Sequence, residues 1–97
     1  MDPTFIFTEQ MLIWKAEKAA WRFITLPLDL SKEIKGFVEP RVGFGSVYVH
    51  ATIGKTTWKT SIFPSKEGTY SLPIKAEVRK KEQLQDGDTV KVEITLQ

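Results

Sequence analysis

Apolar and polar residues alternate along two segments of the chain, and this period of two is typical of β-strands with one buried face. The segments run from Ser46 to Gly54 and from Thr89 to Gln97. Their alternate apolar residues are Val47, Val49, Ala51 and Ile53 in the first segment and Val90, Val92, Ile94 and Leu96 in the second. Both segments are therefore predicted to be strands, and both are bounded by glycine-bearing turns.

Four further segments have the alternation or the composition of strands. Thr57 to Phe63 alternates and is rich in β-branched and aromatic residues, which suit a pleated surface. The other three run from Thr4 to about Trp14, from Trp21 to Leu26 and from Thr69 to Leu72. The chain is thus predicted to contain six strands.

A short helix is predicted between the second and third strands. Leu30, Ile34 and Phe37 have the i, i+4, i+7 spacing of one helix face. Asp29 or Ser31 is expected to cap its N-terminus. A helix of about two turns is not stable alone, so it is expected to pack against the sheet.

An internal repeat predicts that the chain has two related halves. Leu26-Pro27-Leu28 and Leu72-Pro73-Ile74 lie 72 − 26 = 46 residues apart, and each is expected to end a strand and open a helix. Proline suits that junction because it cannot donate to a sheet ladder and its fixed φ fits the first helical position. The second helix is expected to contain Ile74 and Val78 as an apolar i, i+4 pair. Each half then reads strand, strand, helix, strand.

The predicted fold is mainly β: a small closed six-stranded pseudo-barrel of two ββαβ halves with two short capping helices. Closing so small a sheet pairs the strand edges that an open sheet would leave bare. Residues 1–97 are expected to form a single domain, with pseudo-halves at about 4–53 and 56–97.

Composition narrows the classes of function. The 97 residues are 41% hydrophobic and 27% charged, as in soluble globular chains, and the net charge of +2 is too small by itself to indicate nucleic acid or an anionic membrane. The absence of cysteine excludes disulfides and thiolate chemistry. Neither a secretory signal nor a transmembrane run is recognisable, so we expect a cytoplasmic protein without cofactors that is a monomer or a weak dimer.

Four stretches of the sequence resemble family 1905 of prokaryotic domains of unknown function. They are Arg41-Val42-Gly43-Phe44-Gly45-Ser46-Val47, Thr56-Thr57-Trp58-Lys59-Thr60-Ser61-Ile62-Phe63-Pro64, Leu72-Pro73-Ile74-Lys75-Ala76-Glu77-Val78-Arg79-Lys80 and Gly87-Asp88-Thr89-Val90. The similarity extends from Trp21-Arg22-Phe23 to the end of the chain. It implies a double-split β-barrel, in agreement with the repeat, and it implies no activity.

Basic residues supply the strongest candidate for a site. Lys75 and Arg79 lie four apart on one face of the second predicted helix, whose start has no Ser, Thr, Asp or Asn to cap it. Lysine in a first helical turn is disfavoured by the helix dipole, and a bound anion would relieve that. The hypothesis is an anion site formed by Arg41, Lys59, Lys75 and Arg79 with hydroxyl donors Thr60 and Ser61.

The alternative is that these cations are solvated surface charges. Lys75 would then pair with Glu77 or Asp88, and water would complete the helix cap. Exposed ion pairs of this kind contribute little to stability.

Aromatic residues are a second candidate feature. Trp14, Trp21, Trp58 and Phe44 could form a platform for a base or another ring. The alternation instead favours Trp21, Phe23 and Trp58 as core residues. Phe44 stands between two glycines, which either permit a tight turn or hold the ring near a ligand.

No catalytic or metal site is predicted. His50 is the only histidine, is expected to face solvent, and has no partner with metal-ligand spacing. Ser61 lacks a base other than lysine and is not in a nucleophile elbow.

Three functions remain open at this point. The first is a non-catalytic binding or scaffolding barrel for an anionic small molecule or an acidic protein partner. The second is a nucleic-acid-binding barrel similar to regulators of this barrel class, which is an analogy of fold alone. The third is an enzyme that uses lysine or serine chemistry.

Overall fold

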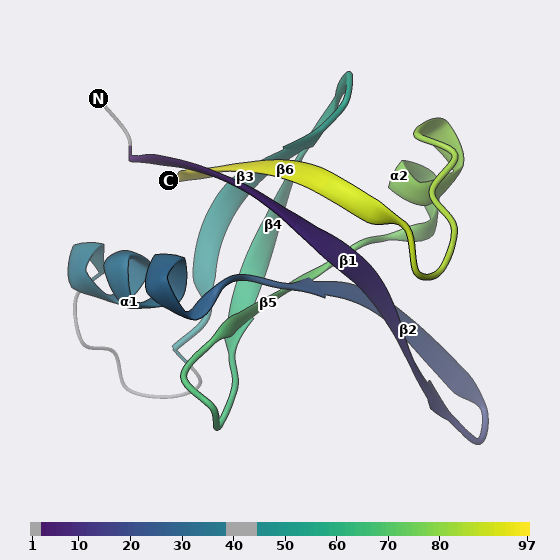
Figure 1. The fold of residues 1–97 in the computed structure, drawn as a ribbon, viewed down its shortest axis with the longest axis horizontal. Helices are drawn as coiled ribbons and strands as arrows, with labels where there is room; N and C mark the ends of the chain where they lie inside the picture. Colours follow the sequence, from purple (N-terminus) through teal and green to yellow (C-terminus); the bar gives the residue numbers. More distant parts are fainter. Residues whose placement is uncertain (1–2, 39–44) are drawn as a thin grey trace.

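The computed structural model describes residues 3–38 and 45–97 and is a closed antiparallel barrel (Figure 1). Along this part of the chain the elements are β1 (Thr4–Ala16), β2 (Ala19–Thr25), α1 (Leu28–Phe37), β3 (Val47–Ile53), β4 (Thr56–Pro64), β5 (Tyr70–Pro73), α2 (Ala76–Lys81) and β6 (Thr89–Leu96). Around the barrel the strand order is β1-β2-β5-β4-β3-β6. The predicted mainly β, six-stranded fold with two short helices is confirmed.

The barrel interior is made by the alternation seen in the sequence. On β3 the side chains of Val47, Val49, Ala51 and Ile53 are buried, and on β6 those of Val90, Val92, Ile94 and Leu96. Met11 of β1 and Ile24 of β2 are opposite one another and have no exposed surface. Apolar burial of this kind is the dominant stabilising contribution in a chain without disulfides.

The order of strand pairing is the same for the two halves. Exchanging β1, β2 and β3 with β4, β5 and β6 reproduces the same set of neighbours around the barrel. Thr25 pairs with Ser71, which is 71 − 25 = 46 positions later, the spacing of the two Leu-Pro steps. Ala51 pairs with Ile94 on the opposite side of the barrel. Because β1–β6, β2–β5, β3–β4 and β3–β6 all join one half to the other, the halves are interlaced.

The two prolines stand at different points relative to their helices. Pro27 is the residue before α1, as the sequence predicts within one residue, whereas β5 continues through Pro73 and α2 begins only at Ala76. The expectation that Ile74 belongs to the second helix is therefore wrong. Ile74 is buried and donates its N–H to the Arg22 carbonyl at 2.9 Å, which extends the sheet by one residue.

The predicted N-cap of the first helix is also wrong. Pro27 occupies the cap position with φ −55°, and no side chain caps the helix. Because proline starts the helix before Asp29, that residue falls in the first turn and Ser31 falls inside the helix. Ser31 is fully buried there, and its Oγ accepts a hydrogen bond from the Tyr70 N–H at 3.1 Å.

The β1–β2 hairpin extends well beyond the rest of the barrel (Figure 1). β1 and β2 pair as far as Ala16 and Ala19, but β5 pairs with β2 only from Phe23 to Thr25. Toward the turn, β2 therefore pairs with β1 on one edge and with no strand on the other. No helix within residues 3–38 and 45–97 is long and apolar enough to cross a membrane.

Candidate functional site

The barrel is split between β4 and β5. β4 pairs with β3 from Thr56 to Ile62, but it pairs with β5 only at Phe63 and Pro64. Pro73 of β5 has no N–H to offer β4, and the chain then turns away into α2. From Thr56 to Ile62, β4 therefore has β3 on one edge and no strand on the other, the edge that faces β5.

A cavity of about 310 Å³ occupies this split. Its lining comes from β2, β4, the end of β5 and the start of α2, namely Ala20, Trp21, Arg22, Trp58, Lys59, Thr60, Pro73, Ile74, Lys75 and Arg79. Four of these residues are cationic and none is acidic. Like charges held around one opening raise the local concentration of anions.

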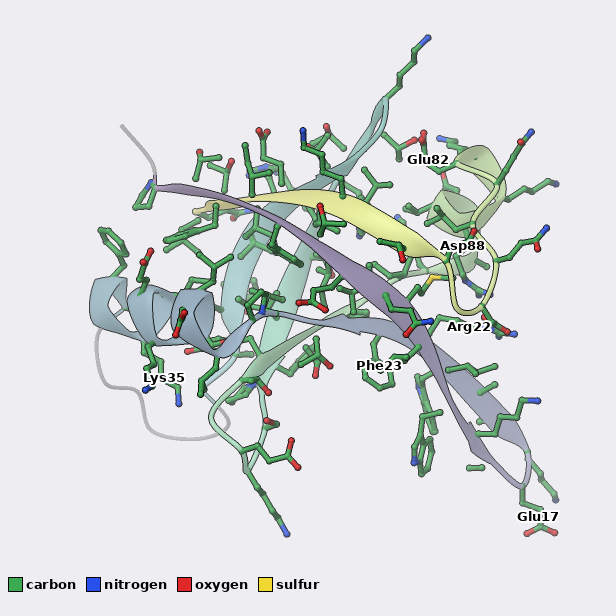
Figure 2. All side chains as sticks on the ribbon, viewed as in Figure 1. Glu17, Arg22, Phe23, Lys35, Glu82 and Asp88 are labelled. Atoms are coloured by element: carbon green, nitrogen blue, oxygen red, sulfur yellow. The ribbon has the colours of Figure 1, made fainter. Side chains whose placement is uncertain are left out.

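Two of the four cations have carboxylate partners outside the cavity lining. The Arg22 guanidinium donates to both carboxylate oxygens of Asp86, at 3.1 and 3.5 Å, which carries Arg22 toward the loop between α2 and β6 (Figure 2). Lys75 Nζ lies 3.9 Å from the Glu77 carboxylate, at the limit of an ion pair. The predicted alternative pairing of Lys75 with Glu77 is thus present in a weak form, while Asp88 instead accepts a hydrogen bond from the Gln85 N–H.

The other two cations are less compensated. Arg79 donates from Nε to the Ile74 carbonyl at 3.2 Å, which fixes the guanidinium against the end of β5 and leaves its two terminal amino groups for other acceptors. Lys59 has no carboxylate within 4.0 Å among the described residues, and its side chain is exposed.

Glu77 of α2 is one of two acidic residues that pair with cations of the cavity, the other being Asp86. It lies 3.1 Å from Lys81 across one helical turn. The hydrogen bond and charge of Lys81, helped by the charge of Lys75, hold the pKa of Glu77 below its ordinary value. Glu77 is therefore ionised throughout the neutral range and partly offsets the charge of Lys75.

The structure brings together four of the six residues predicted for the anion site. Lys59, Lys75 and Arg79 line the cavity, and so does Thr60. Ser61 is on β4 but is not among the lining residues. Arg41 and Phe44 lie outside the described residues. The predicted lack of a side-chain cap on the second helix holds, with Lys75 in the cap position rather than the first turn.

Sequence reasoning missed Arg22 as a member of this group. The signal was a single cation in an otherwise apolar and aromatic strand segment, Trp21-Arg22-Phe23. Alternation places Arg22 on the same side of β2 as the fully buried Ile24. A charged residue at such a position has to find a partner, and here it finds Asp86.

The tryptophans divide into one core residue and one exposed pair. Trp58 is only 9% exposed, as predicted. Trp21 is 53% exposed, so the prediction that it belongs to the core is wrong; Phe23 is half-buried. Trp21 lies on the face of β2 opposite the fully buried Ile24, and its ring meets that of Trp14 with 4.9 Å between the ring centroids.

The histidine and the metal-ligating residues give no second site. His50 is half-buried on β3, opposite Lys59 in the strand register. Within residues 3–38 and 45–97 no three His, Asp or Glu side chains are grouped as metal ligands.

The fold and the cavity together define a class: small closed antiparallel barrels with a cationic cavity at a split in the sheet. Comparison of sequences gives the family. The family model described as "Domain of unknown function (DUF1905)" matches residues 7–94, and the chain belongs to that family. No curated protein matches the chain significantly.

Proposed function

We propose that this barrel is a non-catalytic binding module that takes up an anionic group, from a small molecule or an acidic partner, in the cavity between β2, β4 and α2. The observation that carries the proposal is the lining itself, four cations with no carboxylate among them. Lys59 and the terminal amino groups of Arg79 are the donors with the least competition.

The cavity also limits the size and shape of the ligand. Its volume of about 310 Å³ is at the lower end of the range for ligand pockets, so a ligand of a few functional groups fits. A guanidinium fixed through its Nε presents its amino groups as a rigid fork, which suits carboxylate and phosphate oxygens. The buried Trp58 adds an apolar wall.

The test is thermal unfolding with added sulfate or phosphate, compared with sodium chloride of equal ionic strength. An anion that binds the folded state raises the melting temperature by mass action. We expect a rise for the wild type and its loss in Lys75→Ala and in Lys59→Ala. Lys91→Ala, an exposed lysine on β6, is the control and should keep the rise. Equal rises in melting temperature in the wild type and all three variants would contradict the proposal.

Nucleic-acid binding is the second candidate, favoured by the exposed Trp14–Trp21 pair beside the cationic cavity. Bases stack on aromatic rings while cations neutralise phosphates. This candidate requires affinity for single-stranded DNA or RNA that falls steeply with added salt and that drops in Trp14→Ala. A shift assay without binding at low salt would exclude it. The enzyme alternative gains nothing from Ser61, which has no hydrogen bond to a histidine or carboxylate among the described residues.

A further inference from the structure

The direction of the backbone groups on β4 decides what its open edge can bind. Ile53 and Thr56 flank the two-residue turn Gly54–Lys55 and form the closing pair of the β3–β4 hairpin. In such a hairpin the closing pair exchanges hydrogen bonds, and bonded and non-bonded pairs then alternate along the ladder.

The alternation gives each β4 residue a side. Trp58 and Thr60 turn their N–H and C=O groups toward β3, whereas Lys59 and Ser61 turn theirs toward the split. Phe63 belongs to the second set, and it is the residue that pairs with Ser71 of β5. The alternation thus correctly places the backbone groups of Phe63 on the side of β4 where it pairs with β5.

The facing edge of β2 is open in the same way. Ala16 and Ala19 close the β1–β2 hairpin, so Ala20 and Arg22 turn their backbone groups away from β1. Arg22 gives its carbonyl to the Ile74 N–H at 2.9 Å, and no described strand pairs with Ala20 on that side. Two strand edges thus flank the cationic cavity.

An open edge normally invites pairing with any other strand, and charged residues protect against it. Lys59 is exposed in the middle of the open part of β4, so an apolar or a basic strand is disfavoured there. An acidic strand is favoured instead, because opposite charges across a strand pair attract. The cations Lys75 and Arg79 line the same cavity and strengthen the preference for an acidic strand.

We propose that an extended acidic segment of a partner protein binds here by adding a strand to the edge of β4. Its main chain pairs with the N–H and C=O groups of Lys59 and Ser61, in the mode of β-strand addition. Its acidic side chains, at alternate positions, face Lys59 on β4 and the cations beside it. This proposal rests on the anion-binding function for its charge preference but adds a requirement for main-chain pairing.

The experiment uses a fluorescein-labelled octapeptide of alternating Glu and Val, acetylated and amidated at its ends, with the full-length protein. Two further versions carry N-methyl groups on the even or on the odd residues, which removes the N–H groups along one edge while keeping the charge. We expect the parent peptide to bind and at least one methylated version to lose about tenfold or more in affinity, equivalent to about 1.4 kcal/mol. A peptide with Lys in place of Glu should not bind.

Amide hydrogen exchange supplies a readout inside the protein. On adding the parent peptide, exchange at Lys59 and Ser61 should slow, whereas Trp58 and Thr60, already bonded to β3, should be unchanged. Lys59→Gln should weaken binding, and Lys91→Gln, also an exposed strand lysine, should not.

The outcomes separate the two proposals. If all three Glu peptides bind equally, or if Lys59 and Ser61 exchange as before, strand addition is wrong while anion binding stands. If sulfate raises the melting temperature but the parent peptide does not bind, strand addition is again wrong and anion binding stands. If sulfate has no effect but the peptide binds and is sensitive to methylation, strand addition stands and the anion site fails.

Discussion

The two halves of the barrel share one topology, and each has a split, because β1 pairs with β2 only from Met11 onward just as β4 pairs with β5 only from Phe63 onward. The helices beside the two splits differ. In the first half α1 has ten residues, its Ile34 is fully buried, and its Phe37 meets Phe5 of β1 edge to face at 6.0 Å. In the second half α2 has six residues and buries only Val78. Strand register makes Trp58 the counterpart of Phe5, since Phe5 pairs with Ile94, Trp58 pairs with Ala51, and Ala51 and Ile94 pair together.

The two helices thus differ in length and in what they place beside the equivalent strands β1 and β4. The longer α1 buries Ile34 and places Phe37 against Phe5, the counterpart of Trp58. The shorter α2 leaves space next to Trp58, and that space is lined by cations. If the cavity binds anions as proposed, the binding surface is formed by the second half together with β2, and the packing of α1 in the first half serves stability.

The largest expected effect is on the free energy of unfolding, and it compares the buried residues of α1 and α2. Ile34→Ala should lower the free energy of unfolding by about 2–5 kcal/mol, because it removes a fully buried side chain from the core. Val78→Ala removes fewer buried atoms and should cost roughly 1–3 kcal/mol. Urea unfolding measures both, with exposed Lys32→Ala as the control. A larger cost for Val78→Ala would reverse the proposed division.

The next effect compares a turn glycine, Gly54 between β3 and β4, with a helix glycine, Gly36 in α1. Gly54 has φ +58° and lies against the Glu82 carboxylate, which bonds Thr56 at 2.7 Å (Figure 2). Gly54→Ala should therefore destabilise the fold by about 1–3 kcal/mol. Gly36→Ala in α1 meets no neighbouring atom and should stabilise it by up to about 1 kcal/mol. Thermal unfolding of the two variants would contradict this if both shifted in one direction.

A smaller effect on stability, with an opposite effect on binding, is expected at Asp86. The Arg22–Asp86 pair is partly exposed, so Asp86→Asn should cost less than about 1 kcal/mol. The same change frees one of the four cavity cations, so the rise in melting temperature with sulfate should increase. A variant with weaker sulfate stabilisation would show that Asp86 holds Arg22 in a binding position rather than competing for it.

The smallest effect concerns Glu77 and acid. Its pKa is lowered in the folded state by Lys81 and Lys75, so its contribution to stability is complete above its ordinary pKa and is lost as pH falls through the lowered one. Protonation also releases Lys75, so sulfate should bind more tightly across the same acidic range. Glu77→Gln should bind sulfate as tightly at neutral pH as the wild type does in acid. An unchanged pH profile in this variant would exclude Glu77 as the cause.

The strands were predictable because alternation is local. The valines of β3 and β6 show within a few residues which face of each strand is buried, and every predicted strand is present. Helix starts were less predictable, since Pro27 and Pro73 look alike in sequence but only the first opens a helix directly. What differs is the bond from Ile74 to Arg22, which depends on a strand far away in the sequence.

The cavity was predictable only in part for the same reason. Lys75 and Arg79 are neighbours along the chain, and their grouping followed from spacing alone. Arg22 joins them through the β2–β5 pairing, which no local pattern reveals. Trp21 was assigned to the core from the alternation, but the buried face of β2 is the one that carries Ile24, and Trp21 lies on the other face.

The interlaced strands also constrain how the protein is made. Thr4 and Thr95 are side by side in the barrel, joined by their hydroxyl groups, although 91 positions separate them. A ribosome adding about 5–20 residues per second needs roughly 5–20 s to travel from one to the other. During that interval the barrel is incomplete, and Phe5 and Phe7 of β1 remain apolar surface of the kind that promotes aggregation.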